Sequence, residues 1–127
     1  MKIIPTTLSP AAIVHRLGGG NVENLQLKPK EQALVPPGIS LFQGDNCDEI
    51  RKQIYQAFPN ATRLLAAAET VGAATVAAIR RVGFDVLADP TRQFPNHVRL
   101  IHPAGAAGFS DANLRSLSKS FTNETRS

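Results

Sequence analysis

The segment FPNHVRLIHP, residues 94–103, restricts the possible folds most, because a run of alternating side chains lies between two prolines. Successive side chains of a strand point to opposite faces of a sheet. In such a strand His97 and Arg99 share one face, while Val98 and Leu100 share the other. The segment therefore predicts a strand with one apolar face for a core and one charged face.

The remainder of the chain divides into short segments that are separated by Pro, Gly and Asp. Strands are predicted at residues 22–27, 39–42, 84–88 and 97–102. Helices are predicted from Asn46 to Phe58, in one or two pieces across the alanine-rich residues 61–82 with Gly72 as an interruption, and from Ser110 to Phe121. Residues 11–17 fit a short capped helix and a strand equally well.

The size and composition fit one compact domain with a proper core, since the chain has 127 residues of which 43% are hydrophobic. We expect a single α+β domain over residues 1–122 and a polar, frayed tail over residues 123–127. Cys47 is the only cysteine, which excludes an internal disulfide and a cysteine zinc site. The histidines lack the spacing of zinc ligands, so no metal site is predicted.

Charge and targeting signals narrow the class of function only slightly. The net charge of +4 and the scattered basic residues are compatible with nucleic acid or with an acidic partner. The sequence has neither the apolar core of a secretory signal nor a run of membrane-spanning length. We therefore expect a cytoplasmic protein without a membrane partner, which a signal-independent system could still export.

Two interpretations of the charged strand face remain open at this level. His97 and Arg99 either face water or line a cleft, where a guanidinium can bind phosphate and an imidazole can exchange hydrogen bonds. Ser40 lacks the Gly-x-Ser-x-Gly context of a hydrolase elbow. The three glycines at 18–20 have no following Lys-Ser/Thr, so they predict a flexible turn rather than a phosphate loop.

Three short motifs followed by a helix carry a resemblance to a known family. They are IVHRLGG at 13–19, GISLF at 38–42 and FDVLADPT…HVRLIHPA at 84–104, and the helix is NLRSLSKSF at 113–121. Their order resembles small, cytoplasm-acting toxins of type VI secretion and of toxin–antitoxin systems that have a fold similar to ADP-ribosyltransferases. The resemblance covers about half of the chain.

The resemblance implies specific roles for four residues. In the family, a serine of a Gly-Thr/Ser-Ser-aliphatic-Phe strand and a later strand histidine matter for toxicity, and Ser40 and His97 match these two catalytic positions. The first core strand of ADP-ribosyltransferases carries an aliphatic-x-Arg motif, which Arg16 matches. NAD would lie in a cleft of a small split β-sheet, with Arg16 or Arg99 on the pyrophosphate and Ser40 on the nicotinamide ribose.

The sequence also departs from the family pattern. Position 39 is Ile where the family often has a hydroxyl residue, and neither Glu69 nor Glu124 lies in a convincing catalytic setting. The resemblance nevertheless implies a bacterial toxin that binds NAD, modifies an intracellular target and has a cognate immunity protein or antitoxin. The alternatives are an RNA-directed toxin, either ribonuclease or RNA 2′-phosphotransferase-like, and a non-enzymatic interaction protein that packs residues 61–82 on a partner.

Overall fold

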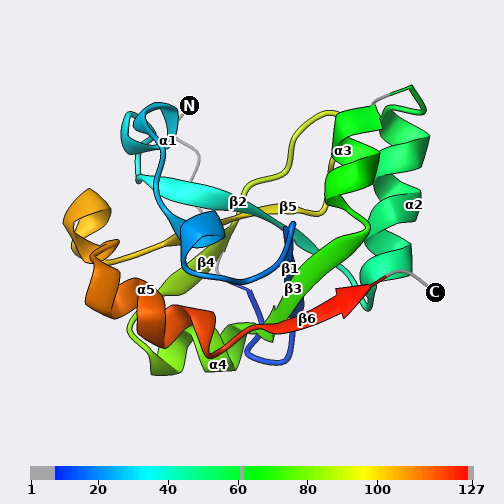
Figure 1. Cartoon of the computed structure of the whole chain (residues 1–127). Helices are drawn as coiled ribbons and strands as arrows, with labels where there is room; N and C mark the ends of the chain where they lie inside the picture. Colours follow the sequence, from blue (N-terminus) through cyan, green and yellow to red (C-terminus); the bar gives the residue numbers. More distant parts are fainter. Residues whose placement is uncertain (1–7, 61, 126–127) are drawn as a thin grey trace.

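A single antiparallel β-sheet organises the molecule, which the computed structural model describes at residues 8–60 and 62–125. In these residues six strands lie in the order β4-β5-β2-β1-β3-β6 (Figure 1). The strands are β1 (Ile13–Leu17), β2 (Gly38–Gln43), β3 (Thr70–Thr75), β4 (Asp85–Ala88), β5 (His97–Ile101) and β6 (Thr122–Thr125). The mixture of helices with an antiparallel sheet confirms the predicted α+β class.

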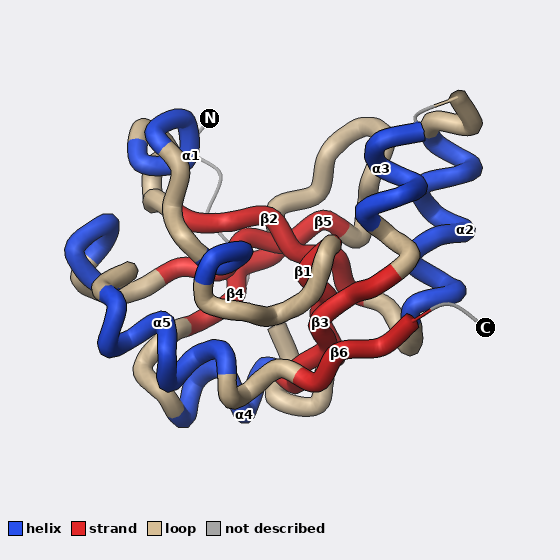
Figure 2. Tube along the Cα trace, viewed as in Figure 1, coloured by secondary structure: helices blue, strands red, loops and turns tan. Residues whose placement is uncertain are grey.

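Helices cover parts of both faces of the sheet (Figure 2). They are α1 (Pro29–Gln32), α2 (Cys47–Ala57), α3 (Thr62–Ala67), α4 (Val76–Arg81) and α5 (Asp111–Ser118), with 3-10 turns at Glu23–Leu25 and Gly105–Gly108. Helices α2 and α3 lie together on one side of the sheet, and α4 and α5 lie on the other. Helix α2 has 11 residues, and no helix within the described ranges is long and apolar enough to cross a bilayer.

The two best-predicted helices begin where their capping residues stand. The side chain of Asn46 accepts a hydrogen bond from the Glu49 backbone N–H at 2.9 Å, which starts α2. The side chain of Ser110 does the same for Asn113 at the start of α5. Each helix then buries one apolar stripe, Ile50 and Ile54 in α2 and the two leucines of α5. The sequence predictions for these helices are confirmed.

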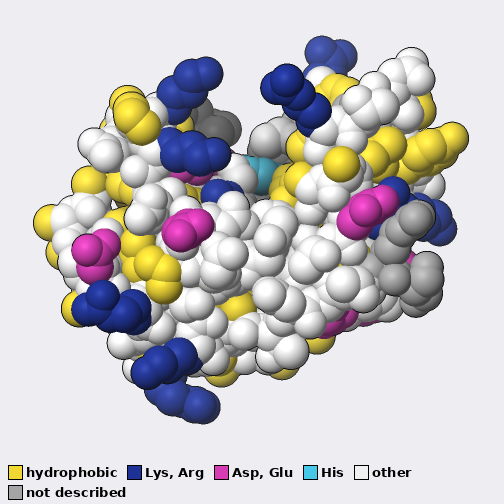
Figure 3. Space-filling model, viewed as in Figure 1, with side chains coloured by type: hydrophobic (Ala, Val, Ile, Leu, Met, Phe, Trp, Pro, Cys, Tyr) yellow, Lys and Arg dark blue, Asp and Glu magenta, His cyan; other side chains and the backbone are white. Residues whose placement is uncertain are grey.

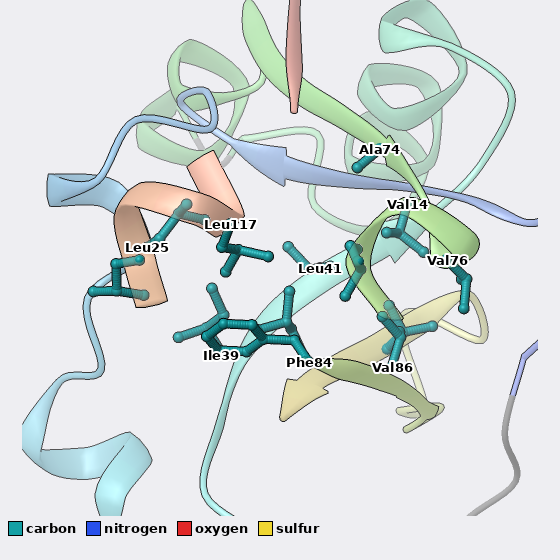
Figure 4. Packing of buried hydrophobic residues seen from close by; sticks show 13 residues of the cluster. Val14, Leu25, Ile39, Leu41, Ala74, Val76, Phe84, Val86 and Leu117 are labelled. Carbon is teal, nitrogen blue, oxygen red and sulfur yellow. The ribbon is translucent and has the colours of Figure 1, made fainter. Parts of the chain in front are cut away.

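The main core lies between the sheet and the layer formed by α4 and α5. Ile39 and Leu41 of β2 meet Leu117 of α5 there, beside Phe84 (Figure 4). The buried members of this main core are Val14, Leu25, Ile39, Leu41, Ala74, Val76, Ile79, Phe84, Val86, Val98, Leu100, Leu114 and Leu117. The predicted burial of Val98 and Leu100 on one face of β5 is confirmed.

A smaller core lies on the opposite face, under α2 and α3. Its buried members are Phe42, Cys47, Ile50, Ile54, Ala68 and Val71. Phe42 contacts Phe94 edge-on, with ring centroids 5.3 Å apart, so the loop between β4 and β5 also packs on this core. This smaller core covers only the end of the face near α2, because Ser40, two residues before Phe42, is exposed.

Two ambiguous or mispredicted segments lie near the start of the chain. Residues 11–17, which fitted helix and strand equally, contain the strand β1. The strand predicted at 22–27 is wrong, since Glu23–Leu25 form a 3-10 turn. The amide of Asn24 explains the turn, because it donates to the carbonyls of Leu17 and Gly19 at 2.7 and 2.6 Å and thereby folds the chain back.

Two further predictions are corrected in the second half of the chain. The helix or helices predicted across 61–82 are interrupted by a whole strand, β3, and not by Gly72 alone. The frayed tail predicted from residue 123 is also wrong for its described part, because Thr122–Thr125 form β6 and pair with β3. Residues 126–127 of that tail lie outside the described residues. Both elements depend on pairing with distant residues, which local sequence patterns do not record.

Candidate functional site

The sheet consists of two three-stranded halves that meet at a weakly paired junction between β1 and β2. Strands β1 and β3 are in register over five residue pairs, and so are β2 and β5. Strands β1 and β2 share only two, His15 with Phe42 and Val14 with Gln43. Beyond these pairs, β1 and β2 are no longer in register, so the sheet opens between its halves β4-β5-β2 and β1-β3-β6.

The guanidinium of Arg16 fills the place where the junction opens. Its Nη1 donates to the carbonyl oxygen of Ser40 at 2.9 Å, and its Nε donates to the carbonyl oxygen of Asn24 at 2.9 Å. Arg16 thus supplies Ser40 with the donor that a continued backbone ladder would have provided. Burial lowers the pKa of Arg16 from its ordinary value, but an arginine remains charged throughout the physiological range.

Ser40 is unusual because it is exposed although it lies in the middle of a central strand. Its neighbours Ile39 and Leu41 are fully buried on the other face. No described residue makes a hydrogen bond with the Ser40 hydroxyl. In the space-filling view the surface is hollowed between the regions of α1 and α3, above β2, and Lys and Arg side chains lie on both sides of the hollow (Figure 3).

His97 and Arg99 project from β5 on the same face as Ser40 and share one partner, Asp89. The antiparallel register places Arg99 opposite Ser40 and His97 opposite Phe42. Arg99 Nη2 donates to Asp89 Oδ2 at 3.0 Å, and Arg99 Nη1 donates to the carbonyl of Pro36 at 3.1 Å. His97 Nδ1 lies 2.8 Å from the Asp89 carbonyl oxygen and 3.4 Å from its Oδ2. Both side chains are therefore held in place rather than free in solvent.

A pocket of about 280 Å³ opens beside Arg99 and Asp89. It is lined by Val35, Pro36, Leu87, Ala88, Asp89, Pro90 and Arg99. The residues come from the segment before β2, from the end of β4 and the loop after it, and from β5. The pocket therefore combines apolar walls with one ion pair.

The four residues singled out in the sequence come together, but not all through their side chains. Arg16, Ser40 and Arg99 lie on the three adjacent strands β1, β2 and β5, and His97 is two residues from Arg99. Arg16 reaches Ser40 through the main-chain carbonyl. Only Arg99 of the four lines the 280 Å³ pocket.

Three residues of this region were missed in the sequence. Asp89 was read only as the end of a strand, yet it joins His97 and Arg99. The available signal was an acidic residue directly before Pro90, shortly before a strand that carries both a histidine and an arginine. Val35 and Pro36 gave no signal beyond a turn, because their position beside Arg99 depends on the tertiary fold.

His15 was not assigned a role from the sequence, and it is completely buried in β1. Its Nδ1 lies 3.3 Å from the carbonyl oxygen of Phe42, while its Nε2 has no hydrogen-bond partner among the described residues. Burial lowers the pKa of His15, and the weaker influences of the Phe42 carbonyl and of Glu124 act in the opposite direction. His15 is therefore a buried imidazole that favours its neutral form.

Within residues 8–60 and 62–125, no three His, Cys, Asp or Glu side chains form a group that could hold a metal ion. Comparisons of the chain with models of protein families, with curated proteins and with solved structures found no match. The candidate site is therefore defined by the geometry of five residues, Arg16, Ser40, Asp89, His97 and Arg99.

Proposed function

We propose that the protein is a bacterial toxin of the ADP-ribosyltransferase-like type, which binds NAD and modifies a target in the cytoplasm. The observation that carries the proposal is the meeting of Arg16, Ser40 and Arg99 on adjacent strands where the sheet opens. The resemblance to ADP-ribosyltransferase-like toxins predicts a split sheet that carries these three motif residues. Ser40 is exposed in a mostly buried central strand, and the hollow above β2 with Lys and Arg side chains on both sides offers room for a dinucleotide (Figure 3).

Three residues, Ser40, Arg16 and His97, would each have a separate role in binding NAD. The free hydroxyl of Ser40 can donate to or accept from the nicotinamide ribose, since no described residue occupies it. Arg16 holds the Ser40 main chain in place and so positions the serine. His97, oriented by the Asp89 carbonyl, can bind a ribose hydroxyl or move its proton.

NAD, when bound, would supply the ADP-ribosyl group: its bond to nicotinamide breaks, and a target atom takes the ribose carbon and gives up a proton. The chain contributes orientation and fixed dipoles rather than a strong nucleophile. The net charge of +4 favours an acidic immunity protein or antitoxin as the cognate partner, and type VI secretion as the delivery route follows from the same resemblance.

The test is the substitution Ser40→Ala, with Ser116→Ala as the matched control. Both serines are exposed, but Ser116 lies on α5, away from the opening of the sheet. We expect Ser40→Ala to reduce NAD turnover and toxicity in an expressing bacterium at least tenfold, with a thermal midpoint within about 2 °C of wild type. Ser116→Ala should leave toxicity, turnover and midpoint unchanged.

Nicotinamide release from NAD and degradation of total RNA should be measured side by side. Loss of nicotinamide release in Ser40→Ala, with intact RNA throughout, supports the proposal. RNA cleavage by the wild type without NAD consumption would replace it with the RNA-directed alternative. A Ser40→Ala protein as toxic as the wild type would show that the opening of the sheet is not the site.

A further inference from the structure

The 280 Å³ pocket beside Arg99 has apolar walls and one polar end. Val35, Pro36, Leu87 and Pro90 form the apolar walls, and the Arg99–Asp89 ion pair forms the polar end. Pockets for complete small-molecule ligands usually measure about 300–1,000 Å³. This pocket is therefore large enough for one ring system and too small for a whole dinucleotide.

The charge at the polar end argues against a phosphate ligand. Arg99 already donates from Nη2 to Asp89 Oδ2 and from Nη1 to the Pro36 carbonyl, so its positive charge is paired. A phosphate that approached Arg99 would also meet the Asp89 carboxylate, which is 35% exposed. An uncharged polar group meets no such repulsion, because the pair offers it both guanidinium N–H donors and carboxylate acceptors.

The mouth of the pocket favours an apolar, flat ligand. Val35, which lines the pocket, is 93% exposed, so its apolar surface faces water. A ring seated against Val35 and Leu87 would remove their apolar surface from water, and this is the main source of affinity for such ligands. Hydrogen bonds to Asp89 and Arg99 would then fix the orientation of the ring.

We propose that this pocket binds an uncharged heteroaromatic ring that carries an exocyclic amino or amide group. The N–H of that group donates to Asp89, and an acceptor on the ring or amide faces Arg99. If the proposed function holds, on which this identification rests, the ring is the adenine of NAD or the free nicotinamide that cleavage releases, because the nicotinamide ring within NAD carries a positive charge. The pyrophosphate lies outside the pocket.

The direct test is titration of the ¹⁵N-labelled full-length protein with nicotinamide, adenosine, NAD and inorganic pyrophosphate, observed by NMR. We expect nicotinamide or adenosine, together with NAD, to shift the backbone amide signals of Val35, Leu87 and Asp89. Pyrophosphate should leave these three signals in place. A shift with adenosine identifies the adenine of NAD as the ring in the pocket, and a shift with nicotinamide identifies the released product.

Two variants test the walls and the charge separately. Val35→Ser should weaken binding of the ring and of NAD about three- to tenfold, because apolar contact area is lost. Leu34→Ser is its matched control, since Leu34 is the exposed neighbour that does not line the pocket. Asp89→Asn leaves the charge of Arg99 unpaired, so pyrophosphate should now shift Leu87 and Val35.

The outcomes separate this inference from the proposed function. A ring that binds in the pocket while NAD neither binds nor is consumed supports the pocket and overturns the proposed function. NAD that binds without shifting Leu87 and Asp89, and with equal affinity in Val35→Ser, overturns the pocket and leaves the proposed function standing. Absence of any shift with the rings and with NAD overturns both.

Discussion

A buried histidine in a central strand is costly to protonate, and His15 of β1 is such a residue. Its ring is fully buried, and its Nε2 has no partner in the described part of the chain. Protonation would place a positive charge and an unsatisfied N–H in the interior, and both cost free energy. Burial therefore lowers the pKa of His15 below the ordinary histidine value of about 6.5.

This shift predicts a loss of stability in acid. Below pH 6.5 the unfolded chain binds a proton on residue 15 that the folded protein takes up only at lower pH. The free energy of unfolding is therefore highest above pH 6.5 and falls as the pH drops, by at most about 1.4 kcal/mol per pH unit from this group. Urea unfolding at pH 7.5, 6.5 and 5.5 measures the slope.

The substitution His15→Gln isolates the contribution of this residue, because glutamine does not titrate and other groups are common to both proteins. We expect the wild type to lose more stability than His15→Gln between pH 6.5 and 5.5. Equal losses in the two proteins would mean that His15 is protonated as easily in the folded state as in the unfolded one.

The sequence pattern reveals some residues of the site and hides others. Ser40, His97 and Arg99 stand in recognisable strand runs, and alternation correctly predicts that Val98 faces the core. Which polar groups share a neighbourhood is a different question, because it depends on register between distant strands. Asp89 joins His97 and Arg99 only through the packing of the loop after β4, so local patterns could not assign it.

At the scale of elements, β3 shows how tertiary pairing overrides local preference. Its sequence, TVGAAT, contains alanines that favour a helix in isolation. In the fold it lies between β1 and β6 and pairs with both. Small side chains suit this position, because the backbone of the three-glycine turn crosses directly over Gly72. The helix prediction failed for residues 70–75 for this reason, whereas α3 and α4 form on either side of β3.

The close approach at Gly72 can be tested by the substitution Gly72→Ala. A Cβ atom there would lie 2.8 Å from the Gly20 Cα and 2.9 Å from the Gly19 carbonyl carbon, and these backbone atoms cannot rotate away. We expect the free energy of unfolding to fall by about 3 kcal/mol, at the upper end of typical overpacking costs. Chemical denaturation of the variant and the wild type measures the difference.

The comparison variant is Gly105→Ala, which isolates backbone conformation from crowding. Gly105 has a φ of +68°, but a Cβ atom there would meet nothing within 4 Å. Its substitution should cost about 1 kcal/mol from the left-handed conformation alone. If Gly72→Ala costs no more than Gly105→Ala, the turn over β3 yields readily and the crowding argument is wrong.

At the scale of the whole molecule, the two halves of the sheet are joined by their packing more than by their hydrogen bonds. Only two residue pairs connect β1 to β2. The main core, however, includes Val14 of β1 and Ala74 of β3 from one half, and Leu41, Val86 and further residues from the other. One face of the junction is thus sealed by side chains. On the opposite face the smaller core covers Phe42, whereas Ser40, two residues before it, is exposed.

This arrangement predicts that the two halves unfold together although their backbone junction is weak. Leu41 is fully buried in β2 at the junction, so Leu41→Ala should lower the free energy of unfolding by about 2–5 kcal/mol. Hydrogen exchange should show loss of protection in both β4 and β6, the two outer strands of the sheet, because β4 packs on the main core and β6 pairs with β3, which packs on it too. Loss confined to β4 and its neighbours would show instead that β4-β5-β2 and β1-β3-β6 are independent units, and a ligand held between them would then have to supply the missing coupling itself.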